Sequence, residues 1–300
     1  MVCESMKVFV TWSPPDISPL LEEYVDGFSV SLACLSRRKL ERGTVVGIRK
    51  LLGISKEVIL DSLGATIAKA RVSSYDPRGQ RHILNLQLWL RPDYIVHKDY
   101  PLLNRNLSMK EKKKLLEKTI RNAEIVVRLR DKFDLKNVIY VIQGWDLESM
   151  IYCTERYVNL GVDMYGLGSS INVSPGELVR RLRAVRGVIG KKAYLHVFGA
   201  LKPSHFHAIK EHVDSVDTST PIKSAAMGYV LFLDRERVRR TRFYKISPED
   251  LDLPLRLYKE VEEAVNELGE RCEDRPPITR LKRVLAAVNA YTLKRATLSK

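Results

Sequence analysis

Carboxylate and amide side chains stand at the ends of several short apolar segments of this chain. These terminal polar residues, with their small neighbours, are Asp61, Ser62, Asp99, Gln143, Gly144 and Asp217. Aspartate is depleted in β-strands, so strand propensity does not explain why three aspartates end such segments. Three carboxylates can divide the displacement of a group at a glycosidic carbon. One attacks as a nucleophile, a second carries a proton to and from the leaving group, and a third accepts hydrogen bonds from the N–H groups of a purine.

These side chains meet only if the segments that carry them are strands of one sheet. We predict strands at 7–12, 28–35, 57–62, 94–99, 138–144, 163–169, 192–200 and 215–220. Helical segments alternate with them, which indicates parallel pairing, and eight such strands favour closure. The predicted fold is therefore α/β, a (β/α)8 TIM-type barrel. An open doubly wound sheet is the alternative, but no Gly-x-Gly-x-x-Gly follows the first strand to support a dinucleotide site.

Capping residues mark where the intervening helices begin. Ser108, with Glu111 three residues later, has the form of a capping box for a helix that runs to about Phe133. Asp146 is a predicted N-cap, and Ser174 precedes a proline at a first helical position. The helices are thus expected to follow the strands at short intervals.

In a (β/α)8 barrel the active site is built at the carboxyl ends of the strands. Our strand boundaries bring Asp61, Asp99, Gln143 and Asp217 to that end, so we expect these side chains to converge on one mouth. Asp214 is the internal rival of Asp217 as a nucleophile, and alternation along the strand should turn it to the opposite side.

The chain is strongly basic, with 51 Lys and Arg against 36 Asp and Glu and a formal net charge of +15. This charge favours a polyanionic partner such as DNA or RNA, and a basic thermophile-type surface is the equal alternative. We predict a barrel domain over 1–232, then over 233–300 a basic segment and two helices packed on the barrel. The expected phosphate contacts are Lys223, Arg235, Arg237, Arg239, Arg240 and Arg242.

Other classes of protein fit the sequence less well. No apolar run approaches the ~20 residues that span a bilayer, and the first residues do not resemble a secretory signal, so we expect a cytoplasmic protein with no membrane partner. The cysteines, which are Cys3, Cys34, Cys153 and Cys272, lie too far apart in the sequence for a zinc knuckle or a redox motif. His205, His207 and His212 are expected on one solvated helix face. No metal and no cofactor is predicted.

Several of these segments resemble, in order and spacing, the motifs of the guanine transglycosylase superfamily, whose members exchange guanine in tRNA or DNA for a 7-deazaguanine. The likeness runs from about residue 57 to 232. The similar segments are Ile59-Leu60-Asp61-Ser62, Asp99-Tyr100-Pro101, Val141-Ile142-Gln143-Gly144, Tyr165-Gly166-Leu167-Gly168-Ser169, Tyr194-Leu195-His196-Val197-Phe198-Gly199, Val213-Asp214-Ser215-Val216-Asp217 with Pro221, and Met227-Gly228-Tyr229-Val230-Leu231-Phe232.

The resemblance implies a role for each matching position. Asp217 corresponds to the family nucleophile, and Asp61 to the aspartate assigned to proton transfer or to support of substrate binding. The base would be bound by Asp99 and Gln143, with Ser62, Gly144 and the turn Gly166, Leu167 and Gly168 beside them. His196 replaces the thioether that stacks on the base, and it either stacks in the same way or is a core histidine with satisfied hydrogen bonds. Lys223 stands where members often have arginine.

Departures from the family pattern point to one branch. The Cys-x-Cys-x2-Cys zinc site is missing, because no cysteine lies between Cys153 and Cys272, and paired glycines after the Asp-Ser motif become Leu63-Gly64. A short form without zinc most resembles the DNA-modifying branch of phages and genomic islands. We therefore expect exchange of guanine, in DNA rather than tRNA, for a base such as preQ0. The alternatives are a base-removing hydrolase and a catalytically silent nucleic-acid-binding barrel. The sequence does not specify the oligomeric state.

Overall fold

The computed structural model describes residues 5–12, 19–62, 79–102, 106–169, 173–199, 203–235, 237–270 and 278–298. Two of the four cysteines, Cys3 and Cys272, and the pair Leu63-Gly64 lie outside the described residues.

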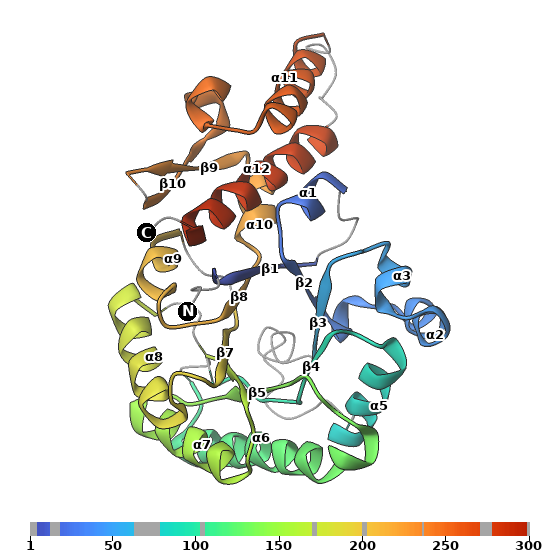
Figure 1. Cartoon of the computed structure of the whole chain (residues 1–300), viewed down its shortest axis with the longest axis vertical. Helices are drawn as coiled ribbons and strands as arrows, with labels where there is room; N and C mark the ends of the chain where they lie inside the picture. Colours follow the sequence, from blue (N-terminus) through green and yellow to red (C-terminus); the bar gives the residue numbers. More distant parts are fainter. Residues whose placement is uncertain are drawn as a thin grey trace.

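Eight parallel strands close into one barrel, in which each strand pairs with the next and β8 returns to β1 (Figure 1). The strands are β1 (Lys7–Thr11), β2 (Gly27–Ser31), β3 (Glu57–Asp61), β4 (Tyr94–Val96), β5 (Val138–Ile142), β6 (Met164–Leu167), β7 (Tyr194–Val197) and β8 (Ser215–Thr218). All eight predicted strands and the predicted barrel are confirmed. The boundaries differ by a few residues, mostly because the polar residues that end each segment leave the sheet.

Helices connect the strands and cover the outside of the barrel (Figure 1). They are α1 (Pro19–Glu23), α2 (Arg37–Val46), α3 (Ile48–Leu52), α5 (Gln80–Leu90), α6 (Met109–Leu129), α7 (Leu147–Asn159), α8 (Pro175–Ile189), α9 (Pro203–Ile209) and α10 (Thr220–Ala226). The capping box of Ser108 and Glu111 is present, as are the caps at Asp146 and Ser174. These side chains satisfy backbone N–H groups that a helix start leaves without a partner.

The barrel interior holds a compact apolar layer. Its buried members are Phe9, Ile59, Val96, Ile139 and Val141. Because side chains alternate along a strand, Asp61 and Gln143 lie on the same inner side as Ile59 and Val141, two residues further toward the carboxyl end. Asp217 pairs in register with Phe9 and shares its inward direction.

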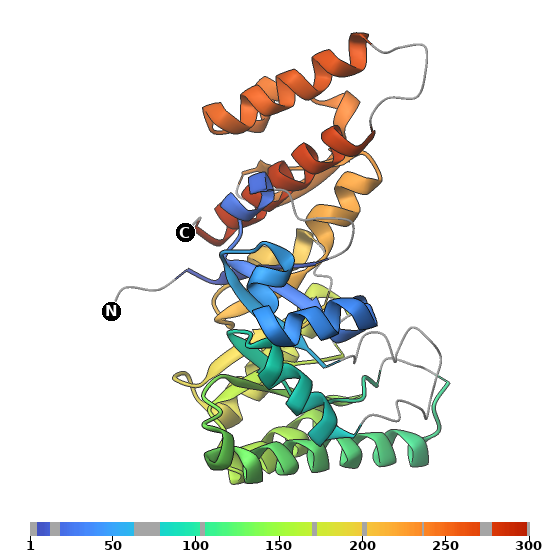
Figure 2. The ribbon, with the colours of Figure 1, turned by 90° about the vertical axis from the view of Figure 1, so that its right-hand side faces the viewer.

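The residues after β8 add a β-ribbon and two helices beside the barrel. The ribbon is β9 (Tyr229–Asp234) against β10 (Arg237–Arg242), and the helices are α11 (Leu255–Glu270) and α12 (Ile278–Leu298). Leu257 and Val261 of α11 pack with Val284 and Leu285 of α12 and with Val230 of β9. Figure 2 shows α11 and α12 at one end of the molecule, opposite α6. The domain boundary predicted after residue 232 falls inside β9, and the division itself stays a prediction.

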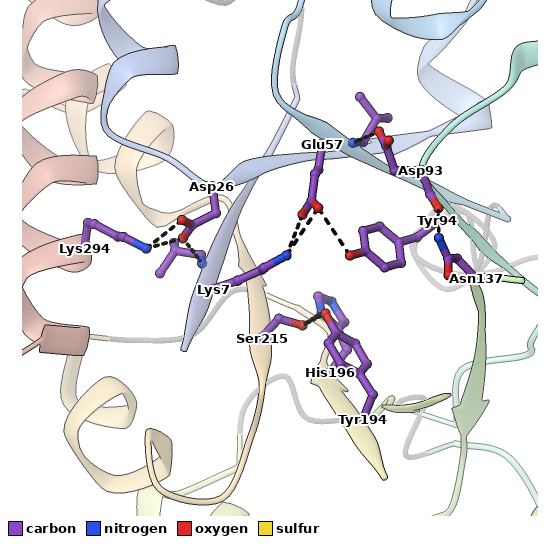
Figure 3. Close-up of polar contacts among 12 residues, drawn as sticks. Lys7, Asp26, Glu57, Asp93, Tyr94, Asn137, Tyr194, His196, Ser215 and Lys294 are labelled. Atoms are coloured by element: carbon purple, nitrogen blue, oxygen red, sulfur yellow. Dashed lines mark hydrogen bonds and ion pairs between the residues drawn. The ribbon is translucent and has the colours of Figure 1, made fainter. Parts of the chain in front are cut away.

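A partly buried ion pair anchors α12 to the amino-terminal end of the barrel. Lys294 Nζ lies 2.6 Å from both carboxylate oxygens of Asp26, and Asp26 Oδ2 also accepts a hydrogen bond of 2.7 Å from the backbone N–H of Val8 (Figure 3). The same carboxylate thus joins β1, the turn before β2 and the last helix.

Among the described residues, no helix combines the length and the apolar character needed to cross a membrane.

Candidate active site

Four polar residues from different strand ends form one connected group, the Asp99–Gln143 cluster, which consists of Ser62, Asp99, Gln143 and Ser169. Gln143 Nε2 donates a hydrogen bond of 2.6 Å to Asp99 Oδ2, and the Ser62 hydroxyl donates one of 3.3 Å to Asp99 Oδ1. The Ser169 hydroxyl donates to Gln143 Oε1. Ser62, Asp99 and Gln143 are each at most 5% exposed. The structure therefore brings these three predicted residues together.

Burial gives the Asp99 carboxyl an unusual affinity for protons. Removal from water raises the pKa of Asp99 to about 6 from its ordinary 3.8, and the hydrogen bonds from Gln143 and Ser62 oppose this shift. A carboxylate held at this depth gains from further N–H donors. The ring and amine N–H groups of a guanine are donors of this kind.

Glycines beside the Asp99–Gln143 cluster leave room for the glutamine. A Cβ added at Gly168 would lie 2.4 Å from Gln143 Nε2, and one added at Gly144 would lie 2.5 Å from Met150. One added at Gly166 would lie 2.4 Å from the ring of Phe198. The N–H of Gly168 donates to the carbonyl of Ile142, and Leu167 packs its side chain into the outer core. The backbone contacts to a base predicted for this turn stay predictions.

Asp217 lies on the inner side of β8 and is 7% exposed. The backbone N–H of Gly199 donates a hydrogen bond of 2.6 Å to Asp217 Oδ1. Gly199 has a φ of 108°, a conformation that glycine adopts without strain. Burial raises the pKa of Asp217 to about 6, while the Gly199 N–H and the Ser29 hydroxyl oppose the shift. The result is a carboxylate that is oriented, partly desolvated and mostly ionised at pH 7.

Asp214 faces the opposite side of the sheet, as alternation predicted. Its Oδ2 accepts hydrogen bonds of 2.7 Å from Arg186 and from the backbone N–H of Leu195. Asp214 is thus an outer structural carboxylate that ties β7 and β8 to α8, and Asp217 is the inner one.

Asp61 ends β3 next to the Asp99–Gln143 cluster. Its Oδ1 accepts a hydrogen bond of 2.7 Å from the backbone N–H of Ser62, the residue whose hydroxyl binds Asp99. Ser31 pairs with Asp61 across the sheet, and Ser29 of the same strand binds Asp217. Asp61 therefore lies at the same end of the barrel as Asp99 and Asp217, on a strand that lies between β8 and β4 in the barrel.

Buried polar side chains of the outer layer fix these strand ends, and the sequence analysis did not single them out. Gln87 of α5 donates to the carbonyls of Leu60 and Val96 at 3.0 and 2.8 Å. The N–H of Val141 donates to His97 Nδ1 at 3.1 Å, so the proton of the neutral imidazole is on Nε2, 3.2 Å from Tyr157 Oη. Burial lowers the pKa of His97 to about 4. A glutamine on the apolar face of a helix was the available signal.

His196 is fully buried on β7. Its ring meets Phe198 edge to face at 4.4 Å between centroids, and its Nδ1 lies 2.7 Å from Ser215 Oγ. The predicted contact between His196 and a base stays a prediction. Phe198, which is only partly buried, is an aromatic ring nearer the surface.

The predicted phosphate contacts lie on α10, on the β-ribbon and in its turn. Arg237, Arg239, Arg240 and Arg242 are exposed along β10, and Arg235 precedes it. The guanidinium groups of Arg240 and Arg242 lie 4.6 and 4.1 Å from the Tyr229 ring centroid. Lys223 is exposed on α10. A cavity of about 250 Å³ between β9 and α12, lined in part by Arg235, Tyr291 and Arg295, belongs to this region and not to the barrel interior.

The histidines after β7 differ from the expectation in two respects. His205 is buried and its Nε2 lies 3.2 Å from the carbonyl of Val173, and α9 ends at Ile209, before His212. The prediction of a solvated histidine face is therefore wrong for His205, because this side of α9 packs against the barrel. Within the described ranges, no group of three or more His, Cys, Asp or Glu side chains has a geometry suited to a metal ion.

Comparison with known proteins gives one family. A family model described as queuine tRNA-ribosyltransferase (TGT) matches residues 33–272. This match includes the Asp99–Gln143 cluster, Asp61 and Asp217. No curated protein matches the chain.

Proposed function

Because the chain belongs to the queuine tRNA-ribosyltransferase family, a family of pentosyltransferases, we propose that it exchanges a guanine in a nucleic acid for a 7-deazaguanine through a covalent bond to Asp217. The observation that carries the proposal is the state of Asp217. It is a buried carboxylate at the carboxyl end of β8, and the Gly199 N–H holds one of its oxygens.

In the first half of the reaction, a carboxylate oxygen of Asp217 attacks C1′ of the target nucleotide. The C1′–N9 bond breaks, its electron pair passes to N9, and Asp61 supplies the proton that makes the departing guanine neutral. In the second half, Asp61 takes the N9 proton of the incoming base, N9 attacks C1′, and the ester bond breaks to restore the Asp217 carboxylate. Two displacements replace one difficult step, and a positioned acid and base typically contributes about 10²–10⁴-fold.

The Asp99–Gln143 cluster is suited to hold the departing and the incoming base in turn. Asp99 offers carboxylate oxygens to N–H donors, and Gln143 offers both an acceptor and a donor. Both bases present similar donor edges, so one cluster can serve both halves of the exchange. The target nucleotide must leave its stack to reach this depth.

We propose DNA, rather than tRNA, as the nucleic acid and preQ0 as the incoming base. The support for DNA is the absence of any cysteine between Cys153 and Cys272, where the zinc site of the family would require three, because a short form without zinc most resembles the DNA-modifying branch. The exposed arginines of β10 and Lys223 of α10 are proposed to contact phosphates.

The test is to incubate the wild-type chain with tRNA and with duplex DNA and to look for a protein–nucleic acid complex that resists denaturant. We expect the wild type to form it, Asp217→Asn to lose it, and Asp214→Asn, the matched outer aspartate, to keep it. Labelled guanine measures exchange in parallel. Exchange by Asp217→Asn at the wild-type rate would refute the mechanism, and base release without incorporation would identify a hydrolase.

A further inference from the structure

A buried imidazole lies directly beneath the proposed nucleophile. His196 is fully buried, and its Nε2 lies 3.9 Å from Asp217 Oδ1. No described residue offers Nε2 a partner within hydrogen-bonding distance. A buried polar atom without a partner is costly in a folded protein, so its direction requires an explanation. The carboxylate of Asp217 is an acidic group within 4 Å of this nitrogen.

The other ring nitrogen ends a chain of hydroxyl groups. Tyr194 Oη lies 2.5 Å from Ser215 Oγ, and Ser215 Oγ lies 2.7 Å from His196 Nδ1 (Figure 3). Burial lowers the pKa of His196 to about 3, so the ring is neutral and carries one proton. Burial also raises the pKa of Tyr194, so the phenol keeps its proton and can donate it to a hydrogen bond.

The proton of a neutral imidazole can be on either nitrogen, and the surroundings decide which. If Nδ1 carried it, the ring would donate to Ser215, Ser215 would donate to Tyr194, and the bare lone pair of Nε2 would face a carboxylate. If Nε2 carries it, the phenol donates to Ser215, Ser215 donates to Nδ1, and an N–H dipole faces the carboxylate. A phenol is the stronger donor of the two hydroxyls. Both considerations favour the proton on Nε2.

We propose that His196 is a positioning residue for Asp217. The hydroxyl groups of Tyr194 and Ser215 hold the Nε2–H of His196 toward Asp217 Oδ1. The inference rests on the proposed function of Asp217. In this proposal His196 orients the carboxylate of Asp217, and Ser215 and Tyr194 keep the His196 proton on Nε2.

The arrangement places two donors around one oxygen. The Gly199 N–H already binds Asp217 Oδ1 at 2.6 Å, and His196 Nε2 lies 3.9 Å from the same oxygen, about 1 Å beyond a good hydrogen bond. The carboxylate charge disappears when the ester forms and returns when it breaks. Oriented donors stabilise that returning charge, so His196 would act mainly on release of the ester.

The direct test is 15N NMR of the histidine side chains in the full-length chain. Imidazole nitrogen shifts distinguish a protonated from an unprotonated nitrogen, and the signal absent from His196→Gln assigns the residue. We expect His196 to carry its proton on Nε2 and not to titrate between pH 5 and 8. Ser215→Ala should shift the proton toward a mixture of the two nitrogens. A protonated Nδ1, or titration within that range, would overturn the inference.

The second test compares two variants of similar size. His196→Leu removes the donor, and we expect the rate of ester breakdown to fall about 10- to 100-fold with little change in KM for the base. His196→Gln can place an amide N–H at the same point and should recover most of that loss. His82→Leu, on an exposed position of α5, is the control.

The outcomes separate the two proposals. If His196→Leu breaks down its ester as fast as the wild type, or if His196→Gln recovers nothing, the inference is wrong while Asp217 stays the nucleophile. If the wild type forms no covalent complex with either nucleic acid, the proposed function fails, and the NMR tautomer alone decides whether His196 directs an N–H at Asp217.

Discussion

Gln143 Nε2 donates a hydrogen bond of 2.6 Å to Asp99 Oδ2, although the two residues are 44 positions apart in the chain. Each follows a buried strand, and the barrel places β4 beside β5. The bond leaves the carboxylate with capacity for more donors, since an ionised carboxylate offers about four lone-pair sites.

Replacing Asp99 should weaken base binding more than it weakens the fold. Asp99→Asn loses an acceptor for the Gln143 amide and for a bound purine. We expect kcat/KM for the incoming base to fall about 100-fold, because the amide leaves a buried N–H donor of the base without the acceptor that the carboxylate offers. Steady-state exchange kinetics measure the effect. Asp131→Asn, an exposed aspartate after α6, should match the wild type, and an equal loss there would remove the assignment.

Gly168→Ala should disturb Gln143 without unfolding the barrel. The added Cβ would lie 2.4 Å from Gln143 Nε2, so the amide must move away from Asp99. We expect base exchange to fall by about 10-fold or more while circular dichroism is unchanged. Gly187→Ala is the matched control, because no atom lies within 4 Å of its added Cβ in α8. Full activity in Gly168→Ala would show that the position of Gln143 is unimportant.

Covalent complex formation should fall in acid. Nucleophilic attack needs the Asp217 carboxylate, and burial raises its pKa to about 6. Below that pH the protonated form dominates, so the single-turnover rate should drop about tenfold for each pH unit below 6. The pH dependence of complex formation tests this expectation. A rate that stays constant down to about pH 4 would contradict it.

Asp217→Asn should stabilise the folded chain at neutral pH. Because the folded-state pKa of about 6 exceeds the ordinary 3.8, the folded chain binds more protons than the unfolded chain between about pH 4 and 6. This carboxylate therefore lowers stability as pH rises through that window, by up to about 3 kcal/mol at pH 7. We expect the Asp217→Asn variant to melt roughly 2–6 °C higher than the wild type at about pH 7.5, with little difference near pH 4. Thermal unfolding measures both melting temperatures. A variant that melts lower than the wild type at neutral pH would count against a destabilising, desolvated carboxylate at Asp217.

The β10 arginines should account for part of the salt dependence of DNA binding. Arg237→Ala and Arg240→Ala each remove one exposed charge, and each lost phosphate contact should reduce the slope of log K against log salt by about 0.9. Titrations at several salt concentrations measure the slope. Arg37→Ala removes an exposed charge from α2, across the barrel in Figure 1, and should leave the slope unchanged. An unchanged slope in the β10 variants would place the DNA elsewhere.

The sequence by itself determined the strands and the polar residues that follow them, to within a few residues. Apolar segments, four of which end at Asp61, Asp99, Gln143 and Asp217, predicted all eight strands, because alternation and burial depend on local residue types. Capping residues such as Ser108 predicted helix starts for the same reason, since a cap satisfies groups only three residues away. The two-residue period of a strand also predicted that the side chains of Asp214 and Asp217 point to opposite sides of the sheet.

Only the tertiary structure decided which of these residues touch. The sequence placed Asp99 and Gln143 at one mouth. Which atoms form hydrogen bonds, such as Gln143 to Asp99 and Gln87 to Leu60 and Val96, depends on how the strands pack. The depth of His196 was likewise hidden, because burial depends on how neighbouring strands close around a side chain. Barrel closure sets both properties: it brings remote strand ends together and removes their side chains from water.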